Sequence, residues 1–96
     1  MNTIKNPELN INKVKVDTSV INLLKENGFD NADTYKEVIK WFKVKHNITS
    51  ELLIDKYRCF TYIYIQNGVA TNADTFYDER EDCLQDMVTN MIELIK

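Results

Sequence analysis

Glycine, proline, histidine and cysteine are all scarce in this chain, and their scarcity removes whole classes of function. The 96 residues include two glycines, one proline, one histidine and two cysteines. Two glycines cannot build a glycine-rich phosphate-binding loop. A single histidine and two cysteines without motif spacing supply neither a metal-ligand set nor a nucleophile paired with a base. We therefore predict that the protein is not an enzyme and has no catalytic residues, metal or cofactor.

Long apolar runs and excess positive charge are also missing. No stretch approaches the 18 or so apolar residues that a membrane-spanning helix needs, and the first residues lack the apolar centre of a signal peptide. We expect a cytoplasmic protein whose two thiols, Cys59 and Cys83, are reduced; a disulfide between them is the alternative. The net charge of −3 disfavours nucleic acid as the main partner, because such binding depends on neutralising phosphates.

The composition that remains is that of one small globular domain, with 44% hydrophobic and 28% charged residues. Residues 17–96 are expected to form a single α+β domain. Residues 1–16 are polar around Pro7 and predict an N-terminal arm, flexible up to about Asn10. Ile11, Val14 and Val16 leave open a short edge strand at the end of this arm.

The order of predicted elements is α-α-β-β-β-α. A capping box at Thr34 and Glu37 starts the second helix, Gly28 ends the first, and Asn67–Gly68 marks a tight hairpin. The closing helix is expected to start between Thr75 and Asp78, with a second capping arrangement over residues 78–81. The predicted elements are helices 18–27 and 34–46, strands 48–55, 57–66 and 69–73, and that closing helix. We expect amphipathic helices to pack on one face of a three-stranded antiparallel meander.

The segment from Thr34 to Ile48, TYKEVIKWFKVKHNI, resembles part of small uncharacterised proteins of bacteriophages, prophages and Bacteroides-type genomes. Those proteins have a helix that ends in W-[LF]-x-x-K-H-N-I, a meander, and a closing helix introduced by Thr and an aromatic residue, here Thr75–Phe76. The likeness spans residues 34–96. This chain departs from the pattern in its last helix, which is acidic where the usual version is rich in Ala and Glu. The resemblance implies a mobile-element origin and an α+β fold, and it implies no activity.

An acidic surface on the closing helix is the first candidate binding site. Its predicted members are Asp78, Glu79, Asp82 and Asp86. Acids near a helix N-terminus are favoured by the helix dipole, so a solvated face explains them. The alternative is a surface that occupies a basic groove on a partner protein, as a phosphate mimic would.

The second strand provides the other candidate, because both of its faces are apolar. Phe60, Tyr62 and Tyr64 point to one side, and Cys59, Thr61, Ile63 and Ile65 point to the other. Three explanations of the aromatic side stay open: cover by the first helix or the N-terminal arm, cover by a second protein or a second copy, and a platform for stacking nucleic-acid bases.

These observations lead to two functional hypotheses. The first is a small non-enzymatic interaction protein of a phage or mobile element, for instance an acidic anti-defence inhibitor similar in role to an anti-CRISPR, with a protein partner or itself as a homodimer. The second is a nucleic-acid-binding accessory domain that uses the strand aromatics and a basic set of residues. That set consists of Lys36, Lys40, Lys43 and Arg58. His46, at the end of the second helix, is expected to be a packed residue and not a general base.

Overall fold

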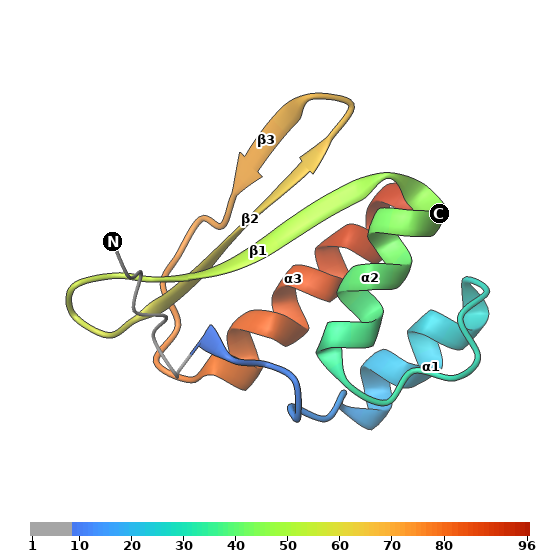
Figure 1. Ribbon diagram of the computed structural model, residues 1–96, viewed down its shortest axis with the longest axis horizontal. Coiled ribbons are helices and arrows are strands. Elements are labelled where there is room, and N and C mark those ends of the chain that lie inside the picture. Colours follow the sequence, from blue (N-terminus) through green and yellow to red (C-terminus); the bar gives the residue numbers. More distant parts are fainter. Residues whose placement is uncertain (1–8) are drawn as a thin grey trace, which may run out of the picture.

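The computed structural model describes residues 9–96, which form an α+β domain. The elements in chain order are α1 (Thr18–Glu26), α2 (Tyr35–His46), β1 (Ile48–Ile54), β2 (Phe60–Gln66), β3 (Val69–Asn72) and α3 (Arg80–Ile95). The three strands form an antiparallel meander in the order β1-β2-β3 (Figure 1). The predicted fold class and element order are confirmed.

Local signals in the sequence explain where the first two helices begin and end. The Asp17 carboxylate accepts a hydrogen bond from the Ser19 N–H (3.1 Å) and caps α1. The Glu37 carboxylate reaches back to the Thr34 N–H (3.1 Å), as the capping box predicts for α2. Gly28 (φ 100°) and Asn47 (φ 55°) adopt the left-handed conformation that stops each helix.

The two turns of the sheet differ in how well the sequence predicts them. Asn67 and Gly68 have φ values of 53° and 79°, so they form the expected two-residue turn between β2 and β3. The turn between β1 and β2 is longer than expected, and β2 starts at Phe60 instead of Tyr57. The Asp55 carboxylate accepts the N–H groups of Tyr57 and Cys59, both at 2.9 Å, and holds this loop closed.

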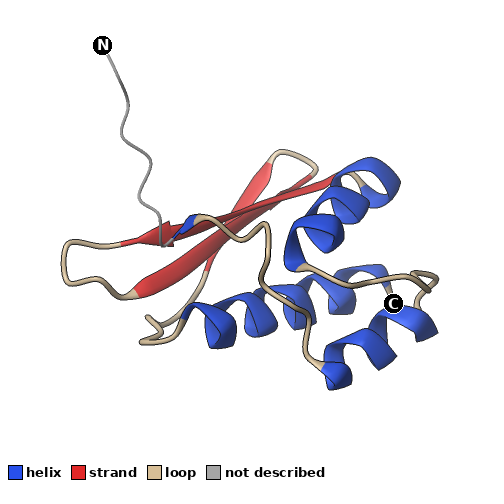
Figure 2. Ribbon diagram, turned by 60° about the horizontal axis from the view of Figure 1, so that its bottom comes forward, coloured by secondary structure: helices blue, strands red, loops and turns tan. Residues whose placement is uncertain are grey.

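All three helices lie on one face of the sheet, which makes a two-layer structure (Figure 2). Helix α2 packs on β1, α3 packs mainly on β2, and α1 packs on α3. The buried stripe of α3 fills the middle of the core with Cys83, Leu84, Met87, Val88, Met91 and Ile92. The expectation that the amphipathic helices pack on one face of the meander is confirmed.

The end of the segment before α1, where the sequence leaves open a short edge strand, is packed on the domain. Val14 and Val16 are buried. The backbone around Lys15 forms a single antiparallel bridge with Thr34, and the Val16 N–H donates to the Asp33 carbonyl (2.9 Å). The rest of the predicted arm, residues 1–8, lies outside the described part of the chain.

Helix α3 starts at Arg80, later than predicted, because the residues before it extend the sheet. Tyr77 and Phe60 exchange two backbone hydrogen bonds of 2.7 Å each. This pairing holds Tyr77 beside the start of β2. The second capping arrangement predicted over residues 78–81 is wrong, since Glu79 is the N-cap and makes no side-chain capping bond.

Candidate interaction surface

The structure decides which side of β2 is covered. Phe60 and Tyr62 point toward the helices and are only 7% and 3% exposed, and Tyr64 is half-buried beside them. Helix α3 covers this side, and none of the three predicted explanations (the first helix or N-terminal arm, a second protein or copy, or a base-stacking platform) named it. The prediction of Phe60 and Tyr62 as a partner-binding surface is therefore wrong, because both rings belong to the core.

Tyr62 ends in a polar cluster between the sheet and α3. The Tyr62 hydroxyl donates to the Asp86 carboxylate (3.0 Å) and accepts from the Asn90 side-chain amide (2.6 Å). The Tyr77 hydroxyl donates to the same Asp86 oxygen, and the two tyrosine rings stack 6.4 Å apart. Asp86 is therefore half-buried against the sheet, and its assignment to an exposed acidic surface is corrected.

The hydrogen bonds of this cluster hold parts of the fold together. Burial, with Asp86 adding to it, raises the pKa of Tyr62 to about 12 and also raises the pKa of Tyr77. Burial raises the pKa of the neighbouring Cys83 thiol to about 12. All three groups hold their protons at neutral pH, so the cluster ties α3 and residues 75–78 to β2.

His46 and Cys59 lie apart from this cluster. The His46 ring packs on Trp41 (4.7 Å between centroids) and Phe42 (6.0 Å), and its Nε2 is buried without a hydrogen-bond partner. Burial, followed by the nearby Asp55 and Asp78 carboxylates, raises the pKa of the Cys59 thiol. A thiol that is harder to ionise than usual is a poor nucleophile.

The other side of β2 belongs to a sheet face that no helix covers within residues 9–96 (Figure 2). We call it the outer face. Alternation along the strands and the observed register place on it residues of all three strands and the residue before β2. These are Thr49, Glu51 and Leu53 of β1, Cys59 just before β2, Thr61, Ile63 and Ile65 of β2, and Ala70 and Asn72 of β3. Ile63 lies between Glu51 and Asn72, and Ile65, which is 40% exposed, lies between Thr49 and Ala70.

Residues 75–78 lengthen the outer face. Because Tyr77 points inward to Asp86, its neighbours Phe76 and Asp78 point to the opposite side. Phe76 is 59% exposed, and a carboxylate oxygen of Asp78 lies 3.9 Å from the Cys59 sulfur. Asp78, Glu79 and Asp82 are all exposed. Asp78 therefore lies at the margin of the outer face, with Glu79 and Asp82 exposed after it at the start of α3.

The β2–β3 hairpin differs from the rest of the surface in carrying no charge. Between Arg58 and Asp74 there is no Asp, Glu, Lys or Arg, although such residues make up 28% of the chain. All four residues of β3 are exposed, and the hairpin extends past the ends of the helices (Figure 1). Natural proteins usually protect an edge strand by keeping it very short or by placing charged residues or a proline on it. Strand β3 is short, with four residues, but it carries no charged residue and no proline.

The residues of the nucleic-acid hypothesis do not meet on one surface. Lys36, Lys40 and Lys43 are exposed on α2, whose buried residues face the core. Arg58 lies in the loop between β1 and β2, at a φ of 65°. Two of the three aromatic rings proposed for base stacking are buried under α3.

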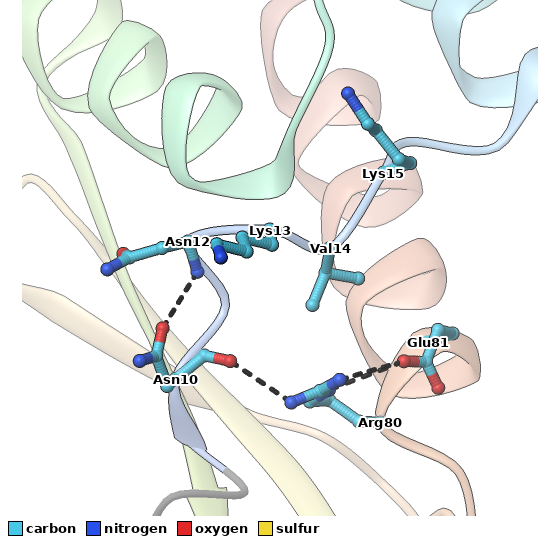
Figure 3. Close-up of a pocket in the computed structure, with 7 residues that line it drawn as sticks. All are labelled: Asn10, Asn12, Lys13, Val14, Lys15, Arg80 and Glu81. Carbon is cyan, nitrogen blue, oxygen red and sulfur yellow. Dashed lines mark hydrogen bonds and ion pairs between the residues drawn. The ribbon is translucent and has the colours of Figure 1, made fainter.

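A cleft of about 650 Å³ opens between residues 10–15 and the start of α3 (Figure 3). Two of its three cationic side chains, Arg80 and Lys15, already have partners within the chain. The Arg80 guanidinium donates to the Asn10 carbonyl (3.0 Å) and to the Glu81 carboxylate (3.3 Å). Lys15 points away from Arg80 and pairs with Asp33 (2.9 Å). Internal pairing makes this cleft a weaker candidate than the outer face.

Comparisons with models of protein families, with curated proteins and with solved structures each find no match. The resemblance of residues 34–96 to small phage and prophage proteins stays a prediction. In the described part of the chain, no helix is both long and apolar enough to cross a membrane. Residues 9–96 also bring together no three His, Cys, Asp or Glu side chains that could hold a metal ion.

Proposed function

We propose that this chain is a small non-enzymatic interaction protein that binds a protein partner through the outer face. The observation that carries the proposal is an apolar strip on a sheet face that no helix of residues 9–96 covers. The strip consists of Leu53, Ile63, Ile65 and Phe76. An antiparallel sheet with helices on one face normally presents a polar second face to water. Apolar side chains there are typical of the centre of a protein interface.

The charges around the strip favour a partner with basic residues at the edge of its own binding site. Asp78 lies beside Cys59, with Glu79 and Asp82 exposed close by at the start of α3. Rim charges of this kind steer association and select partners more than they add affinity. A protein with a Lys- and Arg-rich groove that also offers an apolar patch would fit. The proposal therefore includes inhibition of a defence protein that binds nucleic acid through such a groove.

Binding of nucleic acid is the less favoured function. The lysines of α2 face solvent away from the outer face, and the aromatic rings that stacking requires are mostly in the core. Binding that depends on phosphate contacts would also have to overcome a net charge of −3.

The test uses variants that change the outer face without touching the core. Phe76→Lys and Ile65→Lys each place a charge on the apolar strip of the proposed interface. The matched control is Val44→Lys, at a side chain of α2 that is 76% exposed. Tagged protein is used to capture partners from a lysate of the source cells, and bound proteins are quantified by mass spectrometry.

We expect Phe76→Lys to reduce capture of a specific partner by at least about tenfold, since aromatic residues at interface centres commonly contribute 2 kcal/mol or more. Val44→Lys should capture the partner as well as the unmodified chain does. Equal capture by all three variants would show that the outer face is not the binding surface.

A further inference from the structure

No strand of residues 9–96 pairs with the outer edge of β3, and this free edge has the properties of a joint between two copies of the chain. The backbone hydrogen bonds show which groups are unpaired. The Ala73 N–H donates to the Tyr62 carbonyl (3.0 Å), and Phe60 and Tyr77 exchange bonds in both directions. Hydrogen-bonded pairs alternate along an antiparallel ladder, so residues paired with Tyr64 and Gln66 also bond toward β2. Ala70 and Asn72 therefore direct their N–H and C=O groups away from the sheet.

This spacing suits pairing of the strand with itself. In an antiparallel pair of two β3 strands with Thr71 opposite Thr71, Ala70 of each copy lies opposite Asn72 of the other. Both outward-facing residues of each strand then exchange N–H and C=O bonds across the joint. Threonine directly opposite threonine is a favourable cross-strand pair. A two-fold axis through this point uses the same patch on both copies, as a symmetric dimer requires.

The distribution of charge also favours a second copy. Strand β3 and its turn carry no charge, so neither copy places like charges at the joint although the chain as a whole is negative. The nearest acid along the chain is Asp74, which lies three residues beyond Thr71. Antiparallel pairing places the two Asp74 residues at opposite ends of the joint, about 20 Å apart at roughly 3.3 Å per residue. That separation exceeds the screening length of about 8 Å in physiological salt.

We propose that the chain forms a symmetric homodimer by antiparallel pairing of β3 with β3 of a second copy, which joins two three-stranded sheets into one. The helices of both copies then lie on the same side, and the two outer faces become one continuous surface. The inference concerns the edge of the sheet and not its outer face, so it stands independently of the proposed function.

The test places charge on the two-fold axis. Thr71→Lys and Thr71→Glu each bring like charges within a few ångströms in the dimer, yet leave the hydrogen bonds between β2 and β3 in place. Sedimentation velocity over a wide range of concentration measures the dimer. The unmodified chain should dimerise, and each variant alone should dimerise at least about tenfold more weakly. An equimolar mixture of the two variants should restore the dimer, because opposite charges then meet.

Two further variants show whether added charge alone, or loss of the fold, explains a weaker dimer. Val44→Lys adds the same charge on α2 and should leave dimerisation unchanged. Ala70→Pro removes an N–H that points to the free edge, and it should weaken the dimer while thermal unfolding shows a folded monomer.

An unmodified chain that stays monomeric at every concentration overturns the inference, and so does a dimer that Thr71→Lys leaves intact. Neither result bears on Phe76→Lys and Ile65→Lys, whose capture experiment tests the proposed function separately.

Discussion

Replacing Asp86 with alanine tests the polar cluster that fixes α3 to the sheet. The Asp86 carboxylate accepts hydrogen bonds from the Tyr62 hydroxyl (3.0 Å) and from the Tyr77 hydroxyl. Hydrogen bonds to a charged group contribute about 1.5–3 kcal/mol each. Because Asp86 is half-buried and water can replace part of what is lost, we expect Asp86→Ala to lower the free energy of unfolding by about 2–4 kcal/mol.

The matched control is Asp82→Ala, one turn earlier on the same helix. Asp82 is exposed and lies in the first turn of α3. Its interaction with the helix dipole contributes about 0.3–1 kcal/mol. Since small domains are stable by only about 5–10 kcal/mol, the free energies of unfolding of the two variants should differ clearly.

Urea denaturation at neutral pH, followed by circular dichroism, measures both variants. A loss for Asp86→Ala that is no larger than the loss for Asp82→Ala would refute the assignment of the cluster. In that case the hydroxyl bonds to Asp86 would contribute no more than an exposed acid does.

Three further predictions concern stability. First, the pKa values of Tyr62, at about 12, and of Tyr77 and Cys83 are raised by folding, so the folded state binds more protons than the unfolded state above about pH 9. Its stability should be complete below that pH and should fall as the pH rises toward 12, less steeply in Tyr62→Phe, as urea midpoints will show. Second, Gly68→Ala should cost about 1–2 kcal/mol, because Gly68 has a φ of 79°; an unchanged thermal midpoint would contradict this. Third, Leu84→Ala should cost about 2–5 kcal/mol, because Leu84 is fully buried, whereas Leu94→Ala, at a more exposed position of α3, should cost much less.

Local patterns in the sequence were sufficient for most of the fold. The capping box at Thr34 and the Asn67–Gly68 turn depend on neighbouring residues only, and both are observed as predicted. The start of α3 depends on a pairing between Tyr77 and Phe60, which lie far apart in the sequence. Thr75 to Asp78 read equally well as a helix start, so the sequence could not reveal that a tertiary pairing of Tyr77 keeps them out of the helix.

The candidate surface was harder to predict because both faces of β2 are apolar. Their periodicity shows that Phe60, Tyr62 and Tyr64 share one side, but it does not show which side α3 covers. Position around the helix likewise did not show whether Asp86 is exposed. Asp82 and Asp86 lie about 40° apart around the helix at 100° per residue, so both were assigned to one acidic surface. They differ only in the folded chain, where the Tyr62 and Tyr77 hydroxyls bond to Asp86.

Isoleucine methyl groups permit the most direct test of the claim that the outer face is the binding surface. NMR spectra of chain labelled at its isoleucine methyls would be recorded with and without the captured partner. We predict that the signals of Ile63 and Ile65 shift or broaden on binding, while those of the buried Ile48 and Ile92 change little. Shifts confined to methyls on the helices, with Ile63 and Ile65 unchanged, would contradict the account.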